Sequence, residues 1–574
     1  MTLTPAQRLP SLGLEDKDIP FITELAADGG VVQLRDTRSL EVKKLRAQAF
    51  LVPQGVKKTS GVAANLLWDS AAYVIGLDKP RKSKAEVTPS AAFRARIAAM
   101  PEAVQADAGM RAVLAALDRA DWTVLHAHPA WAEIQETNPV MSFQLTGDID
   151  LVCQRPAVAA AALPMAAMDA RSGLCLVEGV TAPIQRLHSA IKGVWGAQSS
   201  GANIVSFNAR SFESYGKTER QGENAPVGER AAFAYTTALN HLLAKDSRNR
   251  VQVGDASTVF WADAPSQFDS EFTLADFFGE TKDEPDRGVR AVQALHRALA
   301  SGQLPVGERD AQFFVLGLAP NAARISVRFW LRAPLAELAP RILQHFADLK
   351  VVRRYDSDSV TPSLFRLLSS IALLGKLDNV PPRLAGEWMR AILEGQPYPA
   401  TLLNAAVIRC KAEQEVTTLR AAVLKAWLNR DHRRTHPEVP ANHQYFKEEL
   451  DMQQTDAPYL LGRLFAVLER VQQQAQPGIN ATIRDRYYGA ASTTPVLVFT
   501  TLLRLKNAHL KKLSEAQTTY FERLIGEIML PLSDFPRQLA LPQQARFALG
   551  YYHQRQAFYT RKDEPTNNNP AQET

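Results

Sequence analysis

A polar segment at 208–224 lies between an apolar run at 204–207 and a pattern typical of a helix from about Gly228. Its amides, hydroxyls and cations suit base edges and phosphate oxygens. We expect the apolar run to form a strand, so that the segment is a long loop held at both ends. The alternative is a solvated surface loop with no ligand. The candidate binding residues of this loop are Asn208, Ser211, Lys217, Arg220, Gln221 and Asn224.

The same loop contains Gly216-Lys217-Thr218, which is similar to the end of a nucleotide-binding P-loop. A P-loop also needs a glycine five residues before Gly216, because its backbone must curl around phosphates. Position 211 is a serine, and Phe212 and Tyr215 are bulky. We therefore interpret this segment as a loop that does not bind a nucleotide.

A second polar loop is expected at 53–63, between a strand and a helix. Two lysines in a loop flanked by Gly55 and Gly61 can approach a phosphate backbone closely, and nearby amides can read base edges. The alternative is a solvated turn. A basic cluster at 78–86 would enlarge the same positive surface. The candidate residues of this loop are Gln54, Lys57, Lys58, Thr59 and Asn65.

Two patterns favour a different function, a metal-dependent nuclease with carboxylate or histidine ligands. His126 and His128 would point to one face of a strand, as some metal sites require, although no third ligand is evident. The acidic segment at 263–286 would supply carboxylates for magnesium. An ordinary strand and a solvated acidic surface are the alternatives. Asp431-His432 is interpreted as part of a linker at 428–444.

Composition indicates a soluble globular protein of 574 residues with a net charge of +6. The mild basic excess fits an acidic partner such as nucleic acid. Cys153, Cys175 and Cys410 have no metal-ligand spacing and suit a reducing compartment. No signal peptide is expected, and no apolar run approaches the roughly 20 residues that span a bilayer. These features predict a cytoplasmic protein with no membrane partner.

The hydrophobic pattern predicts an α+β protein with a mixed, strand-containing N-terminal region and an all-α C-terminal half that ends in a four-helix bundle. We expect domain 1–335, a helical connecting region and linker at 336–450, a bundle at 451–560 and a disordered tail at 561–574. Strands are expected at 31–36, 48–53, 141–149, 172–184 and 313–330, the last with a turn at Pro320-Asn321.

The expected bundle also carries basic residues, with Tyr487 and Tyr488 beside them. A basic face with aromatic rings is typical of proteins that bind single-stranded nucleic acid. Charge that only keeps the bundle helices soluble is the alternative. The candidate residues are Arg484, Arg486, Arg504, Lys506, Lys511 and Lys512.

Several stretches together carry a family resemblance. They are SFNARSFESYGKTERQGENAPVGERAAFAYTTALNHLL at 206–243, ANLLWDSAAYVIGLDK at 64–79, FFVLGLAPNAARISVRFW at 313–330 and RYYGAASTTPVLVFTTLLRLKNAHLKKL at 486–513. Taken in their order along the chain, these stretches resemble the large subunit of the type I-C CRISPR surveillance complex (Cascade). None of the stretches is a catalytic motif.

The resemblance implies a non-catalytic subunit of an RNA-guided antiviral complex, with no cofactor and no metal. Such a subunit recognises the protospacer-adjacent motif, promotes duplex opening and R-loop formation, holds the displaced strand and helps recruit a helicase-nuclease. Its implied partners are the CRISPR RNA-containing backbone and 5′-end subunits, a small subunit made from the same gene, the target double-stranded DNA and the displaced strand, and the helicase-nuclease.

The resemblance also implies roles for particular residues. The two loops would contact the flanking duplex, with phosphate contacts from Lys57, Lys58, Lys217 and Arg220 and base reading by Gln54, Asn65, Asn208, Gln221 and Asn224. Thr59 and Ser211 are the remaining candidate DNA-binding residues of the two loops. In the family the small subunit corresponds to the C-terminal bundle, and Met452, just before its first helix, is the predicted internal translation start.

Overall fold

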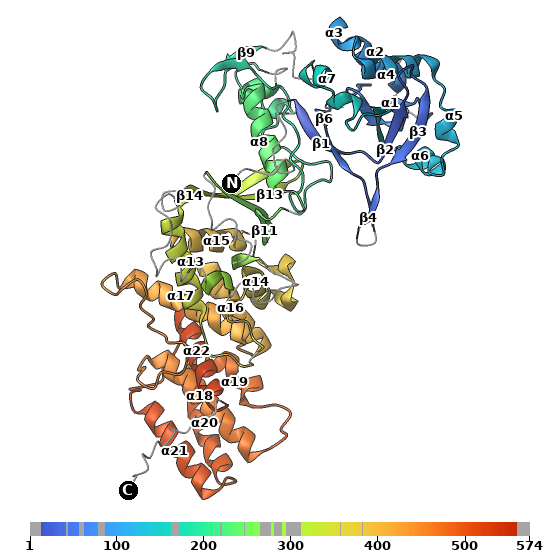
Figure 1. Ribbon diagram of the computed structural model, residues 1–574. Coiled ribbons are helices and arrows are strands. Elements are labelled where there is room, and N and C mark those ends of the chain that lie inside the picture. The colour runs from blue at the N-terminus through green and yellow to red at the C-terminus, as the bar shows by residue number, and fades with distance from the viewer. Residues whose placement is uncertain are drawn as a thin grey trace, which may run out of the picture. The chain divides into compact units, whose positions relative to one another are not determined.

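The computed structural model (Figure 1) describes most of the chain. The described residues are 13–41, 44–56, 62–78, 87–161, 171–207, 209–217, 221–245, 247–263, 277–279, 290–293, 295, 312–355, 357–381 and 383–559. They form two compact units. The N-terminal unit comprises Thr2–Lys192 and Ser200–His241, and the C-terminal unit comprises Gly193–Ser199 and Leu242–Thr574. These units divide the chain differently from the boundaries expected near residues 335 and 450.

The N-terminal unit is built on a four-stranded sheet of order β3-β2-β8-β7. The two central strands pair in parallel, and each outer strand is antiparallel to its neighbour. The central strand β2 is FITEL and is almost wholly buried, which is typical of a strand covered on both faces. The strands are β2 (Phe21–Leu25), β3 (Val31–Asp36), β7 (Trp68–Ser70) and β8 (Val140–Leu145).

Helices and short strand pairs complete this unit. The helices are α1 (Ala71–Val74), α2 (Pro89–Ala98), α3 (Glu102–Gln105), α4 (Ala108–Arg119), α5 (Thr123–His126), α6 (Trp131–Thr137), α7 (Pro156–Ala161) and α8 (Glu229–Leu242). The antiparallel pairs are β1 (Leu14–Asp18) with β6 (Ala49–Pro53), β4 (Ser39–Glu41) with β5 (Lys44–Arg46), and β9 (Ser172–Leu174) with β10 (Thr181–Pro183). The predicted strands at 31–36 and 48–53 are thus confirmed.

The C-terminal unit begins with an antiparallel sheet of order β11-β12-β13-β14. Along β14 the side chains alternate, so that Phe329, Leu331 and Ala333 are buried while Trp330 and Arg332 are exposed. The buried face packs against α13 and α15. The predicted change from strands to helices falls where expected, since β14 is followed at once by α13. The bounds are β11 (Arg250–Val253), β12 (Ala256–Ala262), β13 (Gln312–Asn321), β14 (Arg324–Pro334), α13 (Leu335–Leu349) and α15 (Leu384–Glu394).

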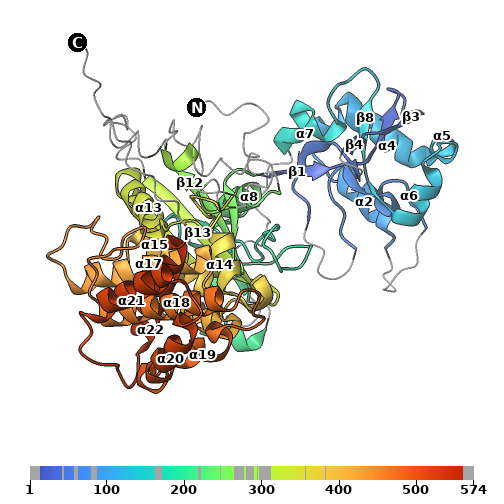
Figure 2. The same cartoon turned by 90° about the horizontal axis from the view of Figure 1, so that it is seen from below.

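The remaining helices extend this core to the C-terminal end of the described chain. They are α14 (Leu364–Ile371), α16 (Ala400–Glu413), α17 (Thr418–Thr435), α18 (Ala457–Ala475), α19 (Ile483–Ala491), α20 (Pro495–Leu510), α21 (Glu515–Met529) and α22 (Leu541–Ala557). Helix α18 packs against α20, α21 and α22, which lie close together in both views (Figures 1 and 2). Gly462 and Gly550 permit the close approach of α18 and α22, because a Cβ at either would lie about 2 Å from a carbonyl oxygen of the other helix.

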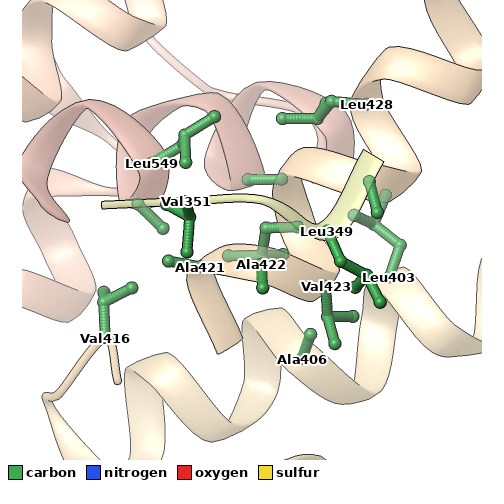
Figure 3. Packing of buried hydrophobic residues seen from close by; sticks show 14 of the residues in the cluster. Leu349, Val351, Leu403, Ala406, Val416, Ala421, Ala422, Val423, Leu428 and Leu549 are labelled. Atoms are coloured by element: carbon green, nitrogen blue, oxygen red, sulfur yellow. The ribbon is translucent and has the colours of Figure 1, made fainter. Parts of the chain in front are cut away.

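A single hydrophobic cluster runs from the sheet through the helices of the C-terminal unit. Figure 3 shows part of it, where Leu549 of α22 lies with Ala421 and Leu428 of α17 and Leu403 of α16. The core is therefore continuous across residue 450. Among the described residues, no helix is both long and apolar enough to cross a lipid bilayer.

A buried carboxylate ties α13 to α17. Asp348 is fully buried, and its carboxylate accepts hydrogen bonds from Arg433 at 2.6 Å, Gln444 at 2.7 Å and Arg430 at 3.3 Å. The Lys425 ammonium donates to the Asp348 backbone oxygen at 3.1 Å. Burial lowers the pKa of Lys425 to about 8, and the neighbouring Asp348 opposes that shift. The network places several cations around one anion inside the helical core.

The structure confirms the predicted α+β class and differs in three local predictions. The segment 428–435, expected to open a linker, is the last part of α17 because Arg430 and Arg433 are held by Asp348. The C-terminal region has a fifth helix, α19, in addition to the four that were predicted. The apolar run 204–207 lies outside any strand, although Ala202 just before it forms an isolated bridge with Ile191.

We predict that Asp348→Asn lowers the free energy of unfolding of the C-terminal unit by about 3–5 kcal/mol, because it leaves Arg430 and Arg433 buried without a counter-ion. Urea unfolding followed by circular dichroism measures the change. The control is Asp431→Asn, which breaks a surface pair with Arg434 and should cost less than about 1 kcal/mol. Equal unfolding midpoints for the two variants would contradict the prediction.

Candidate nucleic-acid interface

The segment 185–192, here called the junction segment, contacts the loop predicted at 53–63. This loop comes first along the chain and is called the first loop from here on, and the loop predicted at 208–224 is called the second loop. The Gln54 side-chain amide, just after β6, donates to the Ser189 hydroxyl at 2.9 Å. Asn203 donates to the backbone oxygens of His188 at 2.9 Å and Ser189 at 3.1 Å. These bonds connect the end of β6 to the entry of the second loop within the N-terminal unit.

The junction segment also holds the far end of the second loop. The Gly222 backbone N–H donates to the Arg186 carbonyl at 3.1 Å, and the Gln185 N–H donates to the Val227 carbonyl at 2.9 Å. The Arg186 guanidinium donates to the Gln221 side-chain oxygen at 3.0 Å. A Cβ at Gly222 would lie 2.1 Å from the Gln185 carbonyl oxygen, so only glycine permits this approach. The two loops found by sequence reasoning thus meet on one segment.

Asn224 braces the second loop from within. Its side-chain oxygen accepts from the Ser214 N–H at 3.0 Å, and its amide donates to the Gln221 carbonyl at 2.9 Å and the Lys217 carbonyl at 3.4 Å. The Lys217 ammonium donates to the Glu223 carbonyl at 2.8 Å. Both side chains therefore maintain the loop conformation, and their predicted contacts with DNA stay predictions.

Asn65 does not belong to the accessible surface. Its side chain is 6% exposed, and its oxygen accepts from the Val56 N–H at 2.9 Å. Its own backbone N–H donates to the Asp69 carboxylate at 2.9 Å. A residue this buried does not present its amide to a base edge, so we remove Asn65 from the base readers. It instead shapes the first loop behind Gln54.

The exposed part of the second loop includes Ser211 and Tyr215, and Gln221 is half-buried. Tyr215 is 97% exposed and adopts a left-handed backbone conformation with φ of 56°, so its ring extends from the loop surface. The predicted contact residues Lys57, Lys58, Thr59, Asn208 and Arg220 lie outside the described residues.

Cations that the sequence analysis did not select lie beside the junction segment. Arg186 and Lys192 are exposed, and the Lys17 ammonium lies 5.2 Å from the centre of the Trp68 ring. Burial raises the pKa of Glu15, while Lys17 and Lys192 act in the opposite direction. The electrostatic surface is therefore mixed, with cations around a partly buried carboxyl group. These cations are isolated in the sequence, so no local pattern predicts that they lie close together in the folded protein.

The candidates in the helical region divide into two groups. Arg486, Arg504, Lys511 and Lys512 are exposed and Lys506 is half-buried. Arg484 instead faces the buried carboxylate of Glu469, at 4.0 Å, and also pairs with Asp485 at 3.4 Å. Tyr488 is 1% exposed and packs in the core. We therefore remove Arg484 and Tyr488 from the surface that would meet a single strand.

The predicted metal ligands are not arranged as expected. His126 lies in helix α5, where its ring packs against Trp131 with ring centres 4.4 Å apart and planes tilted by 49°, and His128 accepts from the Ala130 N–H at 3.1 Å. The prediction of a strand here was wrong, so the two rings do not share a strand face. No three His, Cys, Asp or Glu side chains in the described part of the chain are placed to hold a metal ion. Most of the acidic segment 263–286 lies outside that part.

The fold and this surface define a protein with two loops of mixed polar and basic character that contact one shared segment. The family of CRISPR-associated proteins described as Cas_Csd1 matches the chain over residues 2–559, and the chain belongs to that family. No curated protein matches it.

We predict that Asn224→Ala increases amide hydrogen exchange at Ser214 about tenfold, because the Ser214 N–H loses its acceptor and the loop loses its brace. Hydrogen-exchange mass spectrometry of peptides from 209–217 measures the effect. Ser211→Ala, an exposed change in the same loop, is the control and should leave exchange as in the wild type. Identical exchange in both variants would show that Asn224 does not brace the loop.

Proposed function

We propose that this chain is the large subunit of a type I-C RNA-guided DNA surveillance complex and that its two loops recognise the protospacer-adjacent motif. The observation that carries the proposal is the convergence of both loops on the junction segment in a member of a CRISPR-associated family. A short duplex motif spans only a few base pairs, so its reader needs several contacts close together. The junction provides that proximity.

The subunit acts by binding, without a catalytic centre of its own. In such complexes base pairing with the guide RNA reads most of the target, while protein reads the short flanking motif on the duplex. We propose that this subunit reads the flank, promotes duplex opening and R-loop formation, and helps recruit the helicase-nuclease. Its proposed partners are the CRISPR RNA-containing backbone and 5′-end subunits in the cytoplasm.

The pair formed by Arg186, exposed on the junction segment, and Gln221, half-buried in the second loop, is the best-placed reader among the described residues. A guanidinium and a carboxamide lie side by side there, joined by the hydrogen bond at 3.0 Å. The amide supplies both donors and acceptors toward a base edge, and the guanidinium attracts phosphate. Neutral amides suit the minor groove, which mainly distinguishes A·T from G·C pairs. Lys57 and Lys58 would add phosphate contacts from the first loop.

We predict that Gln221→Ala relaxes discrimination between flanks, whereas the double variant Lys57→Ala/Lys58→Ala weakens binding to all flanks. A lost base contact costs about 1–3 kcal/mol for the preferred flank only. Each lost phosphate contact lowers the slope of log affinity against log salt by about 0.9. The measurement is binding of the assembled guide-RNA complex to target duplexes carrying every trinucleotide flank, at several salt concentrations.

Gln135→Ala is the matched control, because Gln135 is an exposed glutamine on α6 of the same unit. It should bind every flank as the wild type does. If Gln221→Ala and the lysine variant both retain wild-type discrimination and affinity, the loops do not read the flank and the proposal fails.

We further propose that the exposed cations Arg486, Arg504, Lys511 and Lys512 hold the displaced strand, and that Met452 starts the small subunit. Met452 is 57% exposed and precedes α18. A product that begins there has about 120 residues and contains α18 to α22, which pack on one another.

We predict that replacing the Met452 codon by an isoleucine codon abolishes the small product and leaves the full-length chain, because initiation then has no start codon there. Immunoblotting through a C-terminal tag measures both products. Gln453→Ala, one residue further along, is the control and should leave both bands. A small product of unchanged size from the Met452→Ile gene would refute the assignment.

A further inference from the structure

Three aromatic rings form a continuous cluster on one face of the C-terminal sheet. Trp261 of β12 stacks on Phe314 of β13 with ring centres 5.4 Å apart and planes within 13°. Trp330 of β14 lies 5.6 Å from Trp261 and 5.7 Å from Phe314. The rings come from three adjacent strands, and Trp261 and Phe314 are direct cross-strand partners. We call this cluster the aromatic platform.

The platform does not belong to the hydrophobic core. Side chains alternate along a strand, so the neighbours Phe260, Phe313 and Leu331 point to the opposite face and are buried there. Trp330, by contrast, is 50% exposed, and Trp261 and Phe314 are partly exposed. Burial of a large aromatic side chain stabilises the folded state strongly, so a cluster of such rings that stays exposed indicates a binding surface.

The platform has one cation directly against its rings, Arg332, among charges of both signs. The Arg332 guanidinium lies 5.7 Å from the Phe314 ring centre, and its Nε donates to the Gln312 side-chain oxygen at 3.2 Å. Arg332 is exposed, as is Arg328, which pairs with Asp255 at 2.8 Å. The carboxylate of Asp263, at the end of β12, accepts from the Gln312 backbone N–H at 2.9 Å. A cation next to open ring faces complements a ligand that is both planar and anionic.

We propose that the aromatic platform binds single-stranded nucleic acid, with bases stacking on Trp330 and its neighbours and a phosphate on Arg332. Every base has a π-face, so such stacking tolerates any sequence, and arginine adds both charge and cation–π attraction. A duplex hides its base faces between neighbouring pairs, so the site selects single strands. Residues of the C-terminal unit form this site, whereas the flank-reading loops proposed above belong to the N-terminal unit.

The test measures binding of the purified full-length chain to a fluorescein-labelled oligothymidine and to a duplex of equal length. Trp330→Ala should weaken single-strand binding about tenfold, and Trp330→Phe should keep most of it because the ring is retained. Arg332→Gln should weaken binding and lower the salt slope by about 0.7. Val327→Ala is the control, since Val327 is also 50% exposed on the same strand and carries no ring.

Equal affinities for Trp330→Ala and Val327→Ala would overturn the proposal, as would a wild-type chain that does not prefer the single strand. A loss in Trp330→Ala that is the same for duplex and single strand would also overturn it. Thermal unfolding verifies that each variant is folded. The assay contains neither guide RNA nor a flanking motif, so its result does not depend on whether the two loops read the flank.

Discussion

Backbone hydrogen bonding is the constraint on which the candidate interface depends. The described residues between 185 and 228 contain little regular structure, and each peptide group in such a segment needs a partner or exposure to water. The nearby apolar cluster is small, with Cys175, Val227, Ala231 and Ala232 at its centre. The loop therefore takes its shape from polar contacts, above all those of Asn203, Asn224 and the junction segment. A surface held in this way presents donors and acceptors without a large core beneath it.

The C-terminal unit is stabilised in a different way. Its sheet and helices share one hydrophobic cluster, and the buried carboxylate of Asp348 joins α13 to the cationic end of α17. Buried charges of this kind are costly unless each is paired, so the network favours one arrangement of these helices over others. The same unit leaves three rings on the open face of its sheet. The opposite face of the same sheet packs in the hydrophobic core.

The two units suggest a division of roles within a CRISPR-associated protein. The N-terminal unit offers amides and cations on loops, which suit the edges and phosphates of a duplex. The C-terminal unit offers ring faces on strands and exposed cations on helices, which suit an unpaired strand. The chemistry of the two surfaces thus differs as the proposed contacts with a duplex and with an unpaired strand would require.

Sequence alone determined the α+β class and the strand-to-helix transition near residue 335, because these follow from local periodicity. The resemblance carried by 206–243 led to the family. Predictions from short-range patterns were wrong where contacts with distant residues determine the local structure or the burial of a side chain. The polar sequence at the end of α17 predicts a linker, but the segment is helical because Asp348 pairs with its arginines. The sequence around Asn65 predicts an exposed amide, but Asn65 is buried and hydrogen-bonded to Val56 and Asp69.

Only the tertiary structure decided which candidates share a surface. Gln54 and Ser189 are far apart in the chain, and so are Trp261 and Trp330, yet each pair is in contact. Neither contact leaves a periodic signal, because strand pairing and loop packing join segments of unrelated sequence. The platform rings alternate with core rings in the same strands, so composition does not distinguish them. The direction in which each side chain points is set by the sheet and by what covers its other face.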